Sequence, residues 1–311
     1  MSTLGDKYIA GFLDADGGMA VDWQAEGARP MLRLCFGQKE EQDEVIHRIQ
    51  EEIGGKIQTV TINGSRYTNL HVFQREGTMA LNRIRQHLVI KRRYADVLLD
   101  LTSKRLEMPI AEAKQWLKEQ RKIASLPLPK HPTRKWLAGY IDGDGCFSIR
   151  GLSKVGAASL VLHIACADFD TEGIAIIQKQ FGGAIMTMCD GKCRQYVLSL
   201  NPSKAKELLA PVVGHMVVKK NQAAFVLGCA EMGHYRDGRN IKAALKQLKA
   251  SPHRLNEPKP DVAVLLSAID SHRWDKNGRF TQCLCCDTKE GKHFATGLCR
   301  PCYQTKYQVM R

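Results

Sequence analysis

The sequence predicts an α/β protein made of two similar halves, and three observations support this fold class. A ten-residue phrase occurs twice, as YIAGFLDADG over residues 8–17 and WLAGYIDGDG over residues 136–145. The residues after each phrase repeat the same order of helix-like and strand-like patterns. The spacing is regular as well, because Asp144 follows Asp16 by 128 positions. Duplication of one α/β unit explains all three observations.

Each phrase predicts a helix with one flat side of small residues. Residues four positions apart share a helix face, so Gly11 and Ala15 form this side on the first helix, and Gly139 and Gly143 form it on the second. A glycine inside a helix costs roughly 0.5–1 kcal/mol relative to alanine, and close contact between two helix backbones compensates that cost. We therefore expect the two phrase helices to pack together, with Asp16 and Asp144 side by side at one end.

The elements that follow each phrase are predicted in the same order. After the first phrase we expect strands over 19–23 and 31–36, a helix over 40–53 ended by Gly54-Gly55, strands over 56–62 and 67–73, and helices from Thr78 onward. After the second phrase we expect strands over 146–150 and 159–164, a helix over 171–181 ended by Gly182-Gly183, strands over 184–188 and 194–200, and helices from Ser203 onward.

A proline-rich segment separates the two halves. Residues 125–133 read SLPLPKHPT, which forbids a continuous helix and suits an extended tether. Thr133 is well placed to cap the second phrase helix. We expect a first half over residues 1–124, a linker over 125–134, a second half over 135–260 and a C-terminal module over 261–311.

Composition narrows the classes of protein and partner. A chain of 311 residues with 44% hydrophobic residues can bury one large core or two ordinary cores, and no apolar stretch approaches the roughly 18–20 residues of a membrane span. The net charge of +14 points to a polyanionic partner, although a basic protein kept soluble by its charge is an equal alternative. The 11 cysteines without a visible secretory signal favour a reducing, intracellular compartment.

The paired phrases, which both end in Asp-x-Asp-Gly, give the chain a family resemblance. Over about residues 5–230 it resembles the two-repeat, single-chain LAGLIDADG homing endonucleases. The resemblance implies two pseudo-symmetric αββαββα halves that pack through the phrase helices, with saddle-shaped antiparallel sheets across duplex DNA. It also implies a monomer that makes a metal-dependent, staggered double-strand break in a long target and so drives intron homing.

The resemblance assigns roles to several polar residues near the phrase helices. Asp16 and Asp144 would bind Mg²⁺ or another hard divalent cation such as Mn²⁺, and bridging metals can activate water and stabilise a leaving oxygen. The alternative is that both carboxylates merely cap helices or strand starts. We interpret Asp14 and Asp142 as structural or supporting groups.

Further active-site positions follow from the same resemblance. Lys91 and Lys219 would stabilise charge near a scissile phosphate, or alternatively grip a more distant phosphate. Gln38 would order solvent at the site, whereas the corresponding position of the second half lies near Cys166 or Asp168.

Recognition of DNA is expected from the strands, because a sheet face presents alternate side chains along a groove. In residues 31–36 the apolar Leu32, Leu34 and Phe36 share one face, so Arg33 points outward. Side chains of types able to contact bases or phosphates are Gln24, Arg29, Arg33, Arg66, Asn69, His71, Arg150, His163, Arg194 and Tyr196.

The C-terminal segment carries two CxxC pairs that predict a structural zinc site. Cys283 and Cys286 are followed after twelve residues by Cys299 and Cys302, a spacing typical of a zinc ribbon or treble clef. The segment is too short to bury a core, so the metal would replace one. The alternative is a loose tail with unligated thiols.

Three functional interpretations follow from these patterns. The favoured one is a metal-dependent, sequence-specific endonuclease that cuts double-stranded DNA. The second is an RNA-binding maturase whose partner is intron RNA, and the third is a DNA-binding regulator that does not cleave. The presence of both Asp16 and Asp144 favours the nuclease over the regulator.

Overall fold

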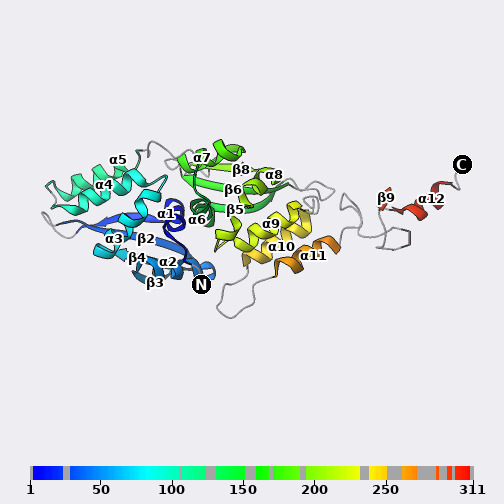
Figure 1. Ribbon diagram of the computed structural model, residues 1–311, viewed down its shortest axis with the longest axis horizontal. Coiled ribbons are helices and arrows are strands. Elements are labelled where there is room, and N and C mark those ends of the chain that lie inside the picture. The colour runs from blue at the N-terminus through cyan, green and yellow to red at the C-terminus, as the bar shows by residue number, and fades with distance from the viewer. Residues whose placement is uncertain are drawn as a thin grey trace.

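The computed structural model describes residues 3–23, 29–105, 107–123, 131–150, 159–167, 171–189, 194–231, 238–250, 261–271, 285–286, 293–295 and 298–308. Two antiparallel four-stranded sheets lie on either side of a central pair of helices, α1 and α6 (Figure 1). This arrangement confirms the predicted α/β fold class with two related halves.

The first half runs from blue to cyan in Figure 1. Its elements are α1 (Asp6–Ala15), β1 (Gly18–Asp22), β2 (Met31–Lys39), η1 (Glu40–Gln42), α2 (Glu44–Ile53), β3 (Lys56–Ile62), β4 (Ser65–Phe73), α3 (Gln74–Ile84), η2 (Arg85–His87), α4 (Arg92–Ser103) and α5 (Ile110–Gln120). The strands pair in the order β1-β2-β4-β3, all antiparallel.

The second half repeats this plan. Its elements are α6 (Arg134–Asp144), β5 (Gly145–Arg150), β6 (Ser159–Ala167), α7 (Glu172–Phe181), β7 (Ala184–Cys189), β8 (Arg194–Leu200), α8 (Pro202–Leu209), η3 (Val213–His215), α9 (Lys220–Glu231) and α10 (Gly238–Ala250). Helix α11 (Val262–Ser271) follows them; it falls within the expected C-terminal module over 261–311 and packs against α9 of the second half. The strand order is β5-β6-β8-β7. Thr133 accepts a hydrogen bond from the backbone N–H of Trp136 at 3.2 Å, which confirms it as the cap of α6.

The two halves correspond residue by residue. Strands β2 and β6 begin 128 positions apart, and so do helices α4 and α9. The glycine pair that ends α2, Gly54 and Gly55, has φ angles of 76° and 101°, and Gly182 and Gly183 after α7 have 74° and 105°. These positive φ angles suit glycine in particular, because a Cβ is disfavoured there. The same turn is therefore built twice.

Each sheet has one face packed on helices and one face turned away from them. In β2, Leu32, Leu34 and Phe36 are at most 1% exposed, while the residues between them are partly exposed. We call the outward side of the first sheet the first open face; it includes Asp22, Arg33, Cys35, Asn69 and His71. The second open face includes Cys146, Ser148, His163, Gln195 and Ser199.

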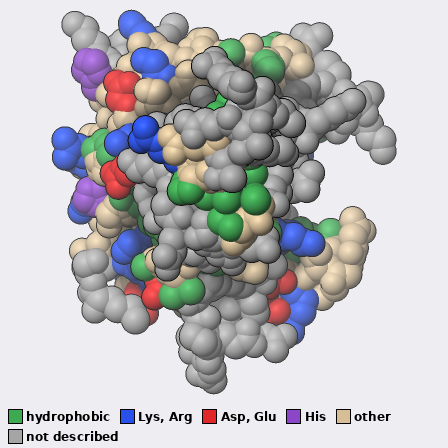
Figure 2. All heavy atoms as spheres, turned by 90° about the vertical axis from the view of Figure 1, so that its right-hand side faces the viewer, with side chains coloured by type: hydrophobic (Ala, Val, Ile, Leu, Met, Phe, Trp, Pro, Cys, Tyr) green, Lys and Arg blue, Asp and Glu red, His purple; other side chains and the backbone are tan. Residues whose placement is uncertain are grey.

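A third group of elements follows the halves. Strands β9 (His293–Ala295) and β10 (Leu298–Cys299) pair antiparallel and are followed by α12 (Arg300–Gln308). They lie at the right-hand end of Figure 1. Viewed from that end, Lys and Arg side chains are spread over the visible face (Figure 2). Among the helices described, none has the length and apolar character that crossing a membrane requires.

Candidate functional site

The site is built on the contact between α1 and α6, whose backbones touch. A Cβ on Gly11 would lie 2.0 Å from the carbonyl oxygen of Trp136, and a Cβ on Gly139 would lie 2.1 Å from that of Tyr8. Both distances are far below a van der Waals contact, so neither position has room for a side chain. The small residues predicted to lie at the contact therefore allow the two helices to pack this closely.

The acidic residues of the two helices emerge at the same end of the pair. A Cβ on Gly143 would lie 2.4 Å from the Cβ of Ala15 and 3.5 Å from the Cβ of Asp16. Asp16 is the exposed C-cap residue of α1, and Asp144 is the last residue of α6 and is partly exposed. Two solvent-accessible carboxylates of this kind supply the hard oxygen donors that fit a hydrated divalent cation.

The other acid of each phrase, Asp14 in the first and Asp142 in the second, is buried and accepts hydrogen bonds from backbone N–H groups. Asp14 is 2% exposed and accepts hydrogen bonds from the N–H groups of Val89 at 2.7 Å and Lys91 at 2.8 Å. Asp142 is 0% exposed and accepts from Val217 at 2.7 Å and Lys219 at 2.9 Å. Burial raises the pKa of both carboxyl groups, and the backbone donors oppose that rise.

The two lysines bind the backbone carbonyl groups next to Asp16 and Asp144. Lys91 Nζ donates to the carbonyl oxygens of Leu13, Ala15 and Gly17 at 2.8, 3.2 and 3.0 Å. A cation at this position also complements the negative end of the helix dipole of α1.

Lys219 binds the end of α6 in a similar way, and two of its three acceptors, Ile141 and Gly143, correspond to Leu13 and Ala15 in the first half. Its Nζ donates to the carbonyl oxygens of Ile141, Asp142 and Gly143 at 3.0, 2.6 and 2.7 Å. Burial lowers the pKa of Lys219, whereas the nearby charges of Asp142, Asp16 and Asp144 act to raise it. One ammonium group is thus electrostatically coupled to both carboxylates of the pair.

Gln38 lies beside Asp16, with its Nε2 at 3.5 Å from Asp16 Oδ2. Its counterpart 128 positions later is Cys166, which is 7% exposed and directs its Sγ to the carbonyl oxygen of Tyr196 at 3.7 Å. Only the first half therefore offers a polar amide at this position. A hollow of about 340 Å³ next to Asp16 is lined by Gly17, Gly18, Cys35, Phe36, Gly37, Asn69 and His71.

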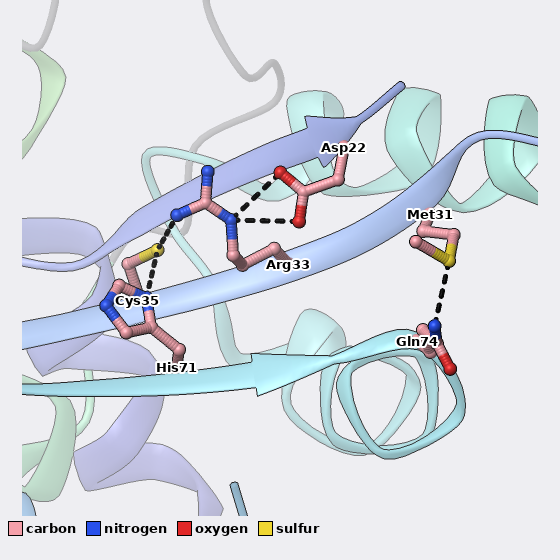
Figure 3. A network of polar contacts seen from close by, with 6 residues as sticks. All are labelled: Asp22, Met31, Arg33, Cys35, His71 and Gln74. Carbon is pink, nitrogen blue, oxygen red and sulfur yellow. Dashed lines mark hydrogen bonds and ion pairs between the residues drawn. The ribbon is translucent and has the colours of Figure 1, made fainter. Parts of the chain in front are cut away.

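The first open face carries a polar network that extends from this hollow. Arg33 Nε lies 3.1 Å from each carboxylate oxygen of Asp22, and its Nη1 lies 3.5 Å from Cys35 Sγ. Cys35 Sγ lies 3.3 Å from His71 Nδ1 (Figure 3). The His71 ring also stacks on Phe73. Figure 3 also shows Gln74 Nε2 beside Met31 Sδ at 2.9 Å. The network holds Arg33 in a fixed orientation on the outward side of β2.

Other residues selected as DNA contacts lie in different surroundings. His163 is on the second open face, where its Nε2 lies 3.3 Å from Ser148 Oγ. Arg66 forms an ion pair with Glu40 at 3.0 Å. By its register in β4 it lies on the opposite side of the sheet from Asn69 and His71. Tyr196 packs against the core on the same side as Leu198.

The remaining predicted DNA contacts are Gln24, Arg29, Arg150 and Arg194. Arg29 is exposed. Gln24, like the alternative position Asp168, lies outside the described residues, as do the side chains of Arg150 and Arg194.

Three of the four predicted zinc ligands come together. The Sγ atoms of Cys286, Cys299 and Cys302 all lie within 4.8 Å of one another. The Sγ atoms of Cys286 and Cys299 are 3.8 Å apart, which matches the edge of about 3.8 Å in a tetrahedron with Zn–S bonds of about 2.3 Å. The donor set therefore fits zinc. Cys283 lies outside the described residues.

Two aromatic residues contact the buried acids of the site but were not predicted as site residues from the sequence. Trp136 Nε1 donates to Asp14 Oδ2 at 2.8 Å, and Tyr8 OH donates to Asp142 Oδ2 at 2.6 Å. Each is the first residue of its ten-residue phrase, so the sequence shows that they occupy equivalent positions. Their hydrogen bonds cross between the halves, and a single half carries no pattern that signals them.

Comparison with known proteins finds similarity in structure alone. No family model and no curated protein matches the chain. The solved structure of the LAGLIDADG homing endonuclease I-GzeII in complex with its DNA target matches with a TM-score of 0.57 and 16% identity, covering 81% of this chain and 100% of that one.

Two further structures agree with this match. The meganuclease I-CpaMI bound to uncleaved DNA matches with a TM-score of 0.53 and 17% identity, covering 77% of this chain and 98% of that one. The endonuclease I-SmaMI bound to cleaved DNA matches with a TM-score of 0.53 and 14% identity, covering 81% of this chain and 99% of that one. The packed phrase helices and the two four-stranded sheets are thus those of the LAGLIDADG homing endonuclease fold.

Proposed function

We propose that the protein is a divalent-metal-dependent, site-specific endonuclease that makes a staggered break in double-stranded DNA. The observation that carries the proposal is the solvent-accessible carboxylate pair, Asp16 and Asp144, at one end of the helix contact. Mg²⁺ or Mn²⁺ bound there would activate water and stabilise the leaving oxygen. Lys91 and Lys219 would hold the two helix ends in place around the scissile phosphates.

Duplex DNA is the substrate that the rest of the molecule fits. The net charge of +14 favours a polyanion, and the two open faces belong to antiparallel sheets that carry polar outward residues, including Arg33, Asn69 and His71 on the first and Ser148, His163 and Gln195 on the second. On the first face we propose Arg33, Asn69 and His71 as base-reading residues. On the second we propose His163, with Arg150 at an outward register position.

The solved structures that share this fold support the proposal by analogy. I-GzeII and I-CpaMI are bound to DNA, and I-SmaMI is bound to cleaved DNA. We propose that this chain acts as a monomer, because one chain contains both members of the carboxylate pair. Cleavage of this kind would serve intron homing.

The test selects a cleavable target from a randomised duplex library in Mg²⁺. Asp16→Asn and Asp144→Asn should each slow double-strand cleavage by about 10²-fold or more, since each removes a charged ligand. Binding should persist in both variants, and cleavage but not binding should require the metal. Asp100→Asn is the matched control, because Asp100 is an exposed acid of α4 that pairs with Lys104.

Two outcomes would contradict the nuclease. Wild-type-like cleavage by both variants would exclude the proposed carboxylate site. Binding of a selected duplex without cleavage in Mg²⁺ or Mn²⁺ would favour a non-cleaving regulator, and preference for intron RNA with no selectable duplex would favour a maturase.

We also propose that Cys283, Cys286, Cys299 and Cys302 bind one structural Zn²⁺. The thiol separation of 3.8 Å and the very small core in the described part of this segment support it. Elemental analysis should give one zinc per wild-type chain, and Cys299→Ser should lose most of it. Cys285→Ser is the control, since Cys285 is exposed and outside the thiol cluster. Zinc retained at full stoichiometry by Cys299→Ser would contradict this ligand set.

A further inference from the structure

The crossed hydrogen bonds between α1 and α6 link the two halves of the site. Tyr8 belongs to α1 but donates to Asp142 of α6, and Trp136 belongs to α6 but donates to Asp14 of α1. The two aromatic residues are 128 positions apart and are each 1% exposed. The crossing is therefore reciprocal, with a phenol on one side and an indole on the other.

The donors around Asp14 and Asp142 require both acids to be acceptors. Asp14 is bonded by the N–H groups of Val89, Lys91 and Trp136, and an N–H group can donate but cannot accept. Asp142 likewise receives backbone N–H groups, from Val217, Val218 and Lys219, in addition to the hydroxyl of Tyr8. Each aromatic donor thus satisfies one of several lone pairs on a buried carboxylate.

The same carboxylates fix the segments that carry the lysines. Asp14 Oδ1 receives the backbone N–H of Lys91, while its Oδ2 is shared between Val89 and Trp136. The orientation of this carboxylate therefore depends on a donor from the opposite half. Because a charge-assisted hydrogen bond is about twice as strong as a neutral one, loss of that donor should loosen the acid and the lysine segment together.

We propose that Tyr8 and Trp136 are positioning residues, each of which sets the lysine segment of the opposite half through its buried aspartate. The inference rests on the proposed nuclease function. Tyr8 acts through Asp142 on Lys219, and Trp136 acts through Asp14 on Lys91. Both aromatic side chains are buried, so both would act without touching a bound duplex or metal.

This role makes a prediction that a purely structural role does not. If each lysine segment serves the cutting of one strand, then Tyr8→Phe and Trp136→Phe slow different strands. A general loss of stability would slow both strands alike. We expect about a tenfold slowing of one strand in each variant, with nicked duplex as the accumulating product, and unchanged affinity for the target.

The experiment uses the full chain and a selected target whose two strands carry different labels. Single-turnover rates are measured for each strand, with binding affinity and thermal unfolding measured in parallel. Tyr140→Phe is the matched control, because it removes a hydroxyl from another fully buried tyrosine of the same helix pair. It should leave both strand rates unchanged.

Trp136→Tyr supplies a rescue variant that the chain itself suggests. A tyrosine at the corresponding position of α1 already reaches its acid with a bond of 2.6 Å. Trp136→Tyr should therefore restore most of the strand rate that Trp136→Phe loses. Tyr8→Phe removes a single oxygen atom and keeps the ring, so it preserves the test if Trp136→Phe fails to fold.

The outcomes separate this inference from the proposed function. Equal slowing of both strands, or a folded Tyr8→Phe variant with wild-type rates on both strands, would overturn the positioning role alone. A wild-type chain that cuts neither strand of any selected duplex would overturn the nuclease proposal and the positioning role with it.

Discussion

The two halves are closely alike at their shared contact and different on their open faces. At the contact, Asp14 and Asp142 bind the same backbone positions, and Lys91 and Lys219 cap the same helix ends. On the open faces, the position of Arg33 is occupied by Val161 in the second half.

Other positions on the open faces differ as strongly. The position of Asp22 is taken by Arg150, that of Cys35 by His163 and that of His71 by Ser199. Residues that must fit the opposite helix are therefore alike in the two halves, while residues that face outward differ in charge as well as size. The two halves of a bound duplex would meet different chemistry, so a suitable target would not be palindromic.

The largest effect is expected from changing the shared contact. In Gly139→Ala the new Cβ would lie only 2.1 Å from the carbonyl oxygen of Tyr8. The helices must separate, so unfolding free energy should fall by about 1–3 kcal/mol, and cleavage of both strands should fall together. Urea unfolding measures the first and strand-resolved rates the second.

A second glycine in the same half provides the comparison for Gly139→Ala. A Cβ on Gly214 would meet no described atom within 4 Å, so Gly214→Ala should change stability little. Equal stability of the two variants would show that the close backbone contact is not needed for the fold.

A smaller effect, confined to one half of the target, is expected from the first open face. Arg33→Ala removes a guanidinium group that Asp22 and Cys35 orient, and leaves the Asp22 charge uncompensated. Binding should weaken by about tenfold, and base preference should relax at positions in one half-site only.

The equivalent substitution in the second half tests whether that effect is local. Val161→Ala removes no hydrogen-bond donor, so base preference should persist in both half-sites. Competition binding against single-base variants of the target measures both proteins. Unchanged preference in Arg33→Ala would remove Arg33 from the base-reading residues.

The smallest effect concerns His71, whose position in the second half is taken by Ser199. Burial, followed by the charge of Arg33, lowers the pKa of His71. The unfolded chain then binds a proton more readily than the folded one, so stability falls as pH drops through about 6.5 and levels off below the folded pKa. Thermal midpoints between pH 7.5 and about 5 should decline less in His71→Gln than in wild type. Parallel curves for the two proteins would contradict this assignment.

The sequence predicts the architecture well because its signals are local and repeated. The strand predicted over 56–62 coincides with β3, and the strand predicted over 194–200 coincides with β8. In β2 the alternation of apolar and polar residues is clean, and Arg33 lies on the outward face as expected.

Alternation does not reveal the outward face of a strand whose two faces are both apolar. In β8, Val197 and Leu198 are 4% and 0% exposed although they point to opposite sides. Alternation therefore gives no face for Tyr196, which packs against the core. The lysine contacts are not predictable from a local pattern either, because the carbonyl oxygens that accept hydrogen bonds from Lys91 lie 74 to 78 positions away in the chain.

The crossed aromatic bonds have a consequence for how such chains diversify. A phenol at position 8 and an indole at position 136 reach the same kind of buried acid at 2.6 and 2.8 Å, so two different rings serve the same purpose in this contact. Halves taken from different parents should therefore join through this contact only where their phrase helices also keep the small residues that let the two backbones touch. Recombination of halves would then create new pairs of base-reading surfaces around an unchanged centre.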